Sequence, residues 1–137
     1  MVIGDPNNKN VHKNLKKLLH LPDSINQTYL CLGKYDSKAL CNVSGTESQI
    51  FDLLVENFWP KPLAIYVKRS NMIVKTTGLK ILKDIIYEFG SPLLVRTANV
   101  FCKPKNNSLQ QIKEAFEDKD INILNKDYTS EFGIGDT

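Results

Sequence analysis

Apolar residues recur with the 3.6-residue period of an α-helix in four stretches of the chain, and short continuous apolar runs separate these stretches. The first helix is predicted to follow the turn residues 5–10 and to end at Pro22. Its apolar stripe is Val11, Leu15, Leu18 and Leu19. Thr46 and Gln49 have the spacing of a capping box and predict a second helix, which the segment 59–62 ends. The predicted inward face of this second helix is Ile50, Leu53, Leu54 and Phe58.

The third and fourth predicted helices have start and stop signals of their own. Thr77 is a candidate cap for the third helix, and Gly90 and Pro92 are placed to end it. The apolar residues of that helix are Leu79, Leu82, Ile85, Ile86 and Phe89. Ser108 and Gln111 form a second capping-box pattern that opens the fourth helix. The predicted inward residues of the fourth helix are Leu109, Ile112 and Phe116.

Strand composition appears between these helices, in residues 27–33, 63–69, 71–77, 93–95 and 121–125. Only Ser70 separates the second run from the third, so the pattern leaves open a tight hairpin and one bent strand. The last residues, "EFGIGDT", are expected to form a loop. The alternation of helices and buried strands predicts an α/β fold, with helices packed on a mostly buried open sheet. A chain of 137 residues with 42% hydrophobic content is expected to form a single domain.

Composition narrows the function classes only a little. A net charge of +3 and a pI near 8.7 are too weakly basic to diagnose nucleic-acid binding. No apolar run approaches the roughly 20 residues that span a bilayer, and the polar start "MVIGDPNNKN" is unlike a signal peptide. We therefore expect a soluble, cytoplasmic protein. Cys31, Cys41 and Cys102 match no metal or disulfide spacing, and buried free thiols are expected rather than a reactive cysteine.

Candidate chemistry is concentrated in "SPLLVRTANVFCKP", residues 91–104. Ligands of open α/β sheets bind beyond the carboxyl ends of strands, and Arg96 follows such an apolar strand. Its guanidinium has forked donors that suit a phosphate or a carboxylate. Thr97 offers a hydroxyl group, Asn99 offers an amide, and the small Ala98 lets a ligand approach the backbone. The alternative is that Thr97 and Asn99 only cap the loop, and the sequence leaves both interpretations open.

Other polar residues carry less specific signals. His12 and His20 have no partner at metal or triad spacing and are expected on the surface. A lysine cluster on the first helix is expected to be a solvated face, although phosphate contacts are the alternative: Lys13, Lys16 and Lys17. Trp59 is expected to anchor the end of its helix in the core. The chain contains no GxGxxG, P-loop lysine, HExxH or GxSxG motif.

Two segments resemble a known family. "FWPKPLAIYV" (58–67) is similar to the "FWPGPLTLVL" segment of the YrdC/YciO-like family, the threonylcarbamoyl-AMP synthases. "GSPLLVRTANVFCKP" (90–104) resembles the "PLAATSANxSGxP" segment of that family. Looser similarity extends to both ends. "GDPNNKNVHKNLKKLLHLP" (4–22) resembles the segment between the "TVYGL" and "KxRP" motifs, and "FGIGDT" resembles the approach to the late Ser-Thr motif.

The resemblance implies a twisted, mixed α/β sheet and a nucleotide-using activity. Family members condense L-threonine, bicarbonate and ATP into threonylcarbamoyl-AMP and pyrophosphate, for the t6A modification of tRNA. The resemblance therefore implies that ATP is a substrate, with or without bound Mg²⁺. No structural metal is expected. Some members bind double-stranded RNA or tRNA. Thr97, Ala98 and Asn99 stand at the Ser-Ala-Asn positions, Lys75 matches a basic residue of the family, and Thr137 matches the late threonine.

The departures from the family pattern leave the activity open. The two cations of "KxRP" align with Leu19 and Leu21. Lys61 replaces a glycine and Arg96 replaces a threonine, which adds positive charge from other directions, while Phe101-Cys102 replaces Ser-Gly. Loss of two charge-assisted contacts would weaken ATP binding by about 3–6 kcal/mol. The family's first and last strands are expected to be missing from residues 1–137.

Three hypotheses therefore stand. The chain is a diverged synthase, a non-catalytic RNA- or nucleotide-binding module, or a truncated product without independent function. A partner protein that covers an exposed sheet edge is a further expectation.

Overall fold

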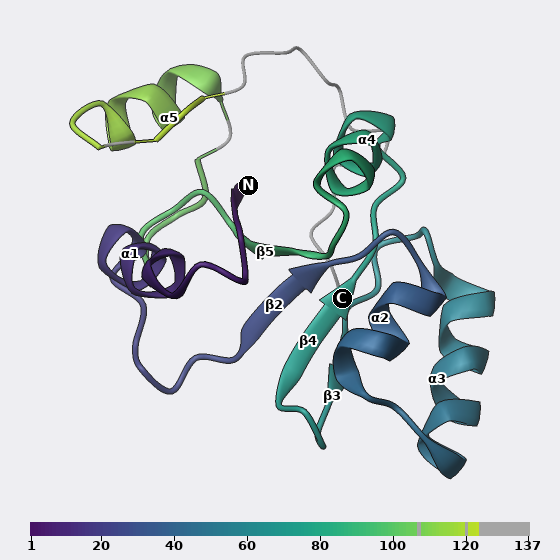
Figure 1. Cartoon of the computed structure of the whole chain (residues 1–137). Helices are drawn as coiled ribbons and strands as arrows, with labels where there is room; N and C mark the ends of the chain where they lie inside the picture. Colours follow the sequence, from purple (N-terminus) through teal and green to yellow (C-terminus); the bar gives the residue numbers. More distant parts are fainter. Residues whose placement is uncertain (107, 120, 124–137) are drawn as a thin grey trace. The chain divides into compact units, whose positions relative to one another are not determined.

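The computed structural model describes residues 1–106, 108–119 and 121–123 (Figure 1). The chain divides into two compact units, and each unit is described by itself. One unit is Asn26–Val95, called here the sheet unit. The other, called here the terminal unit, comprises residues 1–25 and the described residues from Arg96 onward. The expectation of one domain over residues 1–137 stays a prediction.

The sheet unit is built around four strands in the order β5-β2-β4-β3. Their bounds are β2 Gln27–Leu30, β3 Ile65–Val67, β4 Met72–Lys75 and β5 Leu93–Arg96. β2 and β4 are parallel, whereas β5 is antiparallel to β2 and β3 is antiparallel to β4. The predicted mixed α/β sheet is therefore confirmed. The question left open for residues 63–77 is also settled, because β3 and β4 are two separate strands of a hairpin.

Helices cover both faces of this sheet. On one face, α4 (Lys80–Phe89) packs Leu82, Ile85 and Ile86 against the strand residues Leu30, Leu93 and Val95. Side chains alternate between the faces of a strand, so Tyr29 and Val74 point to the opposite face. There Tyr29 lies near Cys41, the last residue of α2 (Lys34–Cys41). This arrangement confirms the prediction of a mostly buried sheet.

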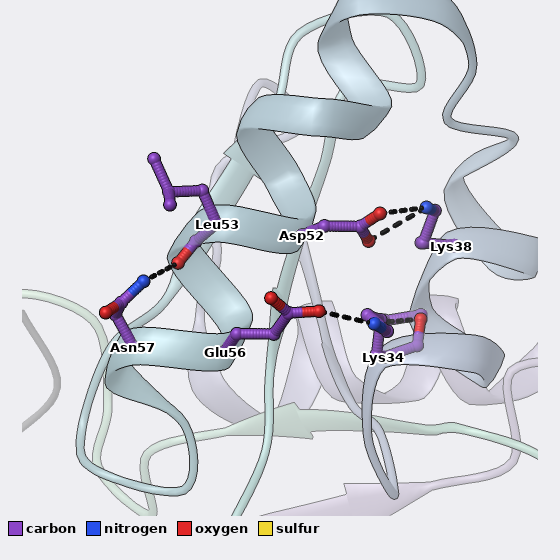
Figure 2. A network of polar contacts seen from close by, with 7 residues as sticks. Lys34, Lys38, Asp52, Leu53, Glu56 and Asn57 are labelled. Atoms are coloured by element: carbon purple, nitrogen blue, oxygen red, sulfur yellow. Dashed lines mark hydrogen bonds and ion pairs between the residues drawn. The ribbon is translucent and has the colours of Figure 1, made fainter.

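The α2 helix was not predicted from the sequence. It begins after Gly33, and its N-terminal turn is held by Asp36, whose carboxylate accepts hydrogen bonds from Leu32 N (2.6 Å) and Gly33 N (2.8 Å). These bonds satisfy main-chain donors that have no partner within the helix. The helix lies beside α3 (Gly45–Phe58), and two lysines join the pair (Figure 2). Lys34 contacts Glu56 at 2.7 Å and Lys38 contacts Asp52 at 2.8 Å.

The predicted start and inward face of the second sequence-derived helix, α3, were wrong. The helix begins at Gly45, whose φ of 61° is left-handed, and its cap residue Ser44 makes no side-chain capping bond. Phe51 and Val55 are the buried residues of α3. Ile50, Leu53 and Phe58, which were predicted to point inward, are exposed by 58%, 62% and 48%. Asp52 and Glu56 turn toward α2, and that pairing sets which side of α3 faces outward.

The region around α4 follows the sequence more closely. Gly90 caps the helix with a φ of 81°, as expected of a C-terminal glycine. Thr77 acts just before the helix, because its Oγ1 accepts a hydrogen bond from Leu79 N at 3.1 Å, while Leu79 is the N-cap. Ile86 is buried in the core, but Phe89, which was expected to point inward, is exposed.

The terminal unit contains β1 (Val2–Gly4), α1 (Lys9–Leu19) and α5 (Leu109–Phe116). Leu15 and Leu19 are the buried residues of α1, and Phe116 is that of α5. The predicted capping box is present, because Ser108 and Gln111 exchange side-chain-to-main-chain hydrogen bonds of 3.2 Å. Residues 121–123 are not in a strand, contrary to prediction. Residues 124–125 of that predicted strand, and the final "EFGIGDT", lie outside the described residues.

Candidate functional site

The polar segment after β5 is partly accessible. Arg96 is half-buried, and this burial lowers the pKa of its guanidinium from the usual value. Thr97 is exposed and Ala98 is buried. The hydroxyl of Thr97 is therefore presented at the surface, while Ala98 fills space beneath the loop. Of the three polar groups expected to face a ligand, this hydroxyl is the most accessible.

Asn99 has two different roles within this loop. Its Nδ2 donates to Val100 O at 3.2 Å and to Lys103 O at 3.0 Å, so its amide holds the loop together. Its Oδ1 is buried and accepts no hydrogen bond from the described residues. A buried acceptor without a donor costs about 1–3 kcal/mol. The donor side of Asn99 thus fits the loop-capping interpretation, and its acceptor is buried without a donor among the described residues.

Two contacts that sequence reasoning missed fix the position of this loop. Asn106 Nδ2 donates to Ala98 O at 2.6 Å, and Phe101 N donates to Leu19 O at 2.8 Å, at the end of α1. The only sequence signal was the run of asparagines after Pro104, since asparagine often bonds to nearby main chain. The Phe101 bond ties the loop to α1, and the Asn106 bond joins two parts of the loop itself.

The two leucines that align with the family's paired cations serve the fold. Leu19 is fully buried, and its main chain anchors the loop through Phe101. Leu21 is half-buried, and its N–H donates to Lys16 O at 2.9 Å. Neither side chain can form a charge-assisted hydrogen bond to a phosphate. Lys16, the nearby cation on α1, does not replace the missing charges, because it pairs with Asp23 at 3.1 Å.

Lys61 and Lys75 belong to the sheet unit. Lys75 ends β4 and is half-buried, and its partner in β2 is Leu30. Lys61 is exposed in the turn after α3, where its N–H donates to Phe58 O at 2.8 Å. Because Ile65 at the start of β3 pairs with Val74, the end of β4 and the segment before β3 meet at one end of the hairpin. Thr137, the remaining candidate, lies outside the described residues.

β5 runs antiparallel to β2, which bears on whether Arg96 lies at a ligand-binding end of the sheet. Leu93 pairs with Leu30, at the carboxyl end of β2, and the strands are antiparallel. The carboxyl end of β5 therefore points to the end of the sheet where β2 and β4 begin. The rule that ligands sit beyond carboxyl ends applies to parallel strands, so it does not support a site after β5. The case for this segment rests instead on the geometry of the loop itself.

Cysteines and other ionisable groups add no second site. Cys31 and Cys41 are buried as expected, and burial raises the pKa of both thiols. Cys102 is exposed, so the expectation of burial was wrong for this residue, which lies in a left-handed turn of the loop with φ 62°. Within the described part of the chain, no group of three or more His, Cys, Asp or Glu residues is placed to bind a metal.

The contacts and the exposure of the two histidines, Trp59 and two lysines of α1 are as follows. His20 is exposed at the C-cap of α1, whereas His12 is half-buried with its Nε2 3.2 Å from Pro6 O. Trp59 stacks edge-on against Phe51, with 6.2 Å between ring centroids, and its Nε1 donates to Leu63 O. Lys13 and Lys17 are exposed on α1.

Comparison with solved structures identifies the fold. The structure of a doubly substituted P. abyssi Sua5 matches 82% of this chain with a TM-score of 0.63 and 21% identity. The crystal structure of P. abyssi Sua5 complexed with L-threonine matches 85% of the chain with a TM-score of 0.68 and 19% identity. This chain has a Sua5-like fold. The YrdC-like α/β fold that the sequence resemblance implied is therefore confirmed.

The match has limits of length and of sequence. This chain spans 37% of the length of each Sua5 chain, a little over a third. No family model and no curated protein matches it. In the described residues, no helix is long and apolar enough to cross a membrane. The Sua5-like fold is thus established here by three-dimensional similarity.

Proposed function

We propose that this chain is a diverged member of the YrdC/YciO-like family that binds L-threonine and ATP at the loop after β5. The observation that carries the proposal is the Sua5-like fold, combined with a loop whose accessible groups suit a small polar ligand. Thr97 presents a hydroxyl, and Asn99 Oδ1 is a buried acceptor without a donor. An ammonium, amino or hydroxyl group of the ligand would satisfy that acceptor.

The reaction proposed for this site is formation of threonylcarbamoyl-AMP from L-threonine, bicarbonate and ATP, with a strongly reduced rate. The reduction follows from Leu19 and Leu21, which supply packing instead of cations. Without cations to orient the phosphates, the carbamate and the α-phosphorus are poorly aligned, and alignment accounts for much of the rate of such reactions. Arg96, at the end of β5, is the cation proposed to contribute to ligand binding at this loop. Lys61 and Lys75 lie toward the other end of the sheet, where β4 ends, and are not proposed for this ligand. Thr137 stays a prediction.

Binding and turnover are tested separately. Isothermal titration with L-threonine, and with ATP in the presence of Mg²⁺, measures binding, and pyrophosphate release in bicarbonate buffer measures turnover. Thr97→Val removes an exposed hydroxyl and keeps the shape of the side chain, so we expect about a two- to tenfold weaker affinity with an unchanged fold. Thr46→Val, at an exposed position of α3, is the matched control and is expected to leave the affinity unchanged.

Asn99→Ala removes both the buried acceptor and the two loop bonds, so its melting temperature is measured alongside its affinity. A loss of affinity in this variant supports the proposal when Thr97→Val, with its unaltered melting temperature, also binds more weakly. Wild-type protein that neither titrates with nor is thermally stabilised by L-threonine or ATP would refute the proposal.

A non-catalytic module that binds RNA or a nucleotide is the second candidate, and the burial of Leu19 favours it. This candidate predicts binding without pyrophosphate release. Binding of a double-stranded RNA or tRNA would weaken steeply with salt concentration. It would persist in Asn99→Ala and fall in Lys61→Glu or Arg96→Glu, whereas synthase-type ligand binding would depend on Asn99. We place either function in the cytoplasm.

A further inference from the structure

The outward side of α3 is an apolar surface that the fold of the sheet unit does not use. We call this surface the α3 seam and define it by Ile50, Leu53, Leu54 and Asn57. Ile50 and Leu53 are exposed by more than half, and Leu54 is half-buried. These residues are three or four positions apart, so they share one face of the helix. Isolated exposed leucines are ordinary, but a continuous apolar helix face marks an interaction surface.

Charges on α3 are arranged so that the seam itself stays uncharged. Asp52 and Glu56 point to α2, where they are neutralised by Lys38 and Lys34, whereas Leu53 and Asn57 point away from α2 (Figure 2). Asn57 Nδ2 donates to Leu53 O at 2.7 Å. The polar residue of the seam is therefore already partly hydrogen-bonded, which reduces the cost of removing it from water.

Two opposite charges remain at the two ends of the seam. Glu47 lies in the first turn of α3, three residues before Ile50, and Lys61 lies three residues after the last helical residue. Neither side chain forms an ion pair with another described residue. The surface thus has an apolar centre, an acid at one end and a base at the other.

Such a surface is complementary to a copy of itself turned end for end. We propose that α3 forms the centre of a symmetric dimer, in which it packs antiparallel against α3 of a second copy of this chain. With the two-fold axis between Leu53 and Leu54, Leu53 of one copy faces Leu54 of the other copy. Ile50 of one copy likewise faces Asn57 of the other. The same register places Glu47 opposite Pro60 of the partner copy, one residue from its Lys61. Two equivalent ion pairs then close the ends, as a two-fold axis requires.

The charges also explain why the occupant is a second copy instead of an unrelated helix. α3 contains acidic residues and no basic one. Among the described residues, Arg69 lies at the N-terminal end of α3, where its Nη1 donates to Ser44 Oγ at 2.8 Å, and Lys61 lies beyond the C-terminal end. An antiparallel pair brings that lysine to Glu47 and also opposes the two helix dipoles favourably. A parallel pair would stack acid on acid and base on base. Standard interfaces bury about 800 Å² per partner, and the seam alone offers less, so we expect a weak dimer with a Kd of roughly tens to hundreds of micromolar.

Sedimentation of the full chain over a wide concentration range measures the association. Glu47→Lys and Lys61→Glu each place like charges together twice in the dimer, so each is expected to weaken it about tenfold or more. The double variant E47K/K61E restores the pairs with reversed sign and is expected to dimerise like the wild type. An equimolar mixture of the two single variants is expected to form a heterodimer, because both end pairs are then opposite in charge. Leu53→Glu is expected to abolish dimerisation.

Tyr87→Glu is the matched control, because Tyr87 is 73% exposed on α4, outside the seam. It is expected to leave the association unchanged. A wild-type chain that stays monomeric near millimolar concentration would overturn the proposal, since a seam of this kind binds in that range. A dimer that the single charge reversals leave intact would also overturn it, because its interface would lie elsewhere. These outcomes do not depend on threonine or ATP binding, so failure here and failure of the proposed function are distinguishable.

Discussion

Substitutions on the two sides of α3 provide the sharpest test of how this helix packs. Phe51 is only 3% exposed and makes an edge-to-face contact with Trp59, whereas Leu53, two residues along, is 62% exposed. We expect Phe51→Ala to lower the free energy of unfolding by about 3–5 kcal/mol, from lost burial and a residual cavity. The lost ring contact is part of this, at about 0.5–1.5 kcal/mol. Leu53→Ala removes a mostly solvated side chain and is expected to change the free energy by less than about 0.5 kcal/mol.

Urea unfolding followed by far-UV circular dichroism measures both changes, at a protein concentration low enough to keep the chain monomeric. Because a loss of 3–5 kcal/mol approaches the total stability of many domains, Phe51→Leu is included as a milder variant and is expected to cost about 1–2 kcal/mol. Its midpoint is expected to fall while the slope m stays the same, since the surface exposed on unfolding hardly changes. A cost for Leu53→Ala equal to or greater than that for Phe51→Ala would show that α3 packs in the orientation expected from the sequence, and the seam would then not exist.

Two further predictions concern the sheet unit. The half-buried ion pair between Lys38 and Asp52 joins α2 to α3, and a double-mutant cycle of Lys38→Met and Asp52→Asn measures its coupling energy. We expect a coupling energy of about 0.5–1 kcal/mol that falls as salt is added. A coupling energy of zero would mean that the pair contributes nothing to stability. Burial raises the pKa of the Cys31 thiol, so above the ordinary thiol pKa of 9.0 the unfolded chain loses this proton while the folded chain keeps it. The free energy of unfolding is therefore expected to fall by about 1.4 kcal/mol per pH unit, which urea unfolding at pH 8 and pH 10 measures. If Cys31→Ala showed the same fall, the effect would come from other groups.

Elements with two independent local signals were predictable from the sequence. The α5 helix has both a capping box and an apolar stripe, and the structure has both in the expected places. In α4, Gly90 caps the helix as predicted, and Leu82, Ile85 and Ile86 of the stripe face the core, whereas Phe89 does not. Local signals of this kind depend on residues within one or two turns, so they do not depend on the rest of the fold. They were sufficient for the alternation of helices and strands and hence for the fold class.

The errors arose where a distant partner decides the outcome. α2 is short and weakly amphipathic, and its start depends on Asp36 binding the main chain of Leu32 and Gly33, with no Ser or Thr three residues before the acid to signal it. Without α2, the strongest apolar stripe of α3 looked like its buried face. Once Lys34 and Lys38 of α2 hold Glu56 and Asp52, the rotation of α3 is set and that stripe faces outward. A pattern of apolar residues shows that a helix has an apolar face, but it does not show which of two such faces the fold buries.

The candidate site shows the same division between local and distant information. The position of the polar segment after an apolar strand was readable from the sequence, whereas the end of the sheet at which it emerges depends on β5 being antiparallel to β2. Strand direction follows from long-range pairing, which no local pattern encodes. Within the loop, the amide donors of Asn99 are bound to Val100 O and Lys103 O, and its buried acceptor has no donor among the described residues. A ligand bound through Asn99 must therefore supply the donor, which makes an amine or hydroxyl group, and not a phosphate oxygen, the chemistry to expect at that atom.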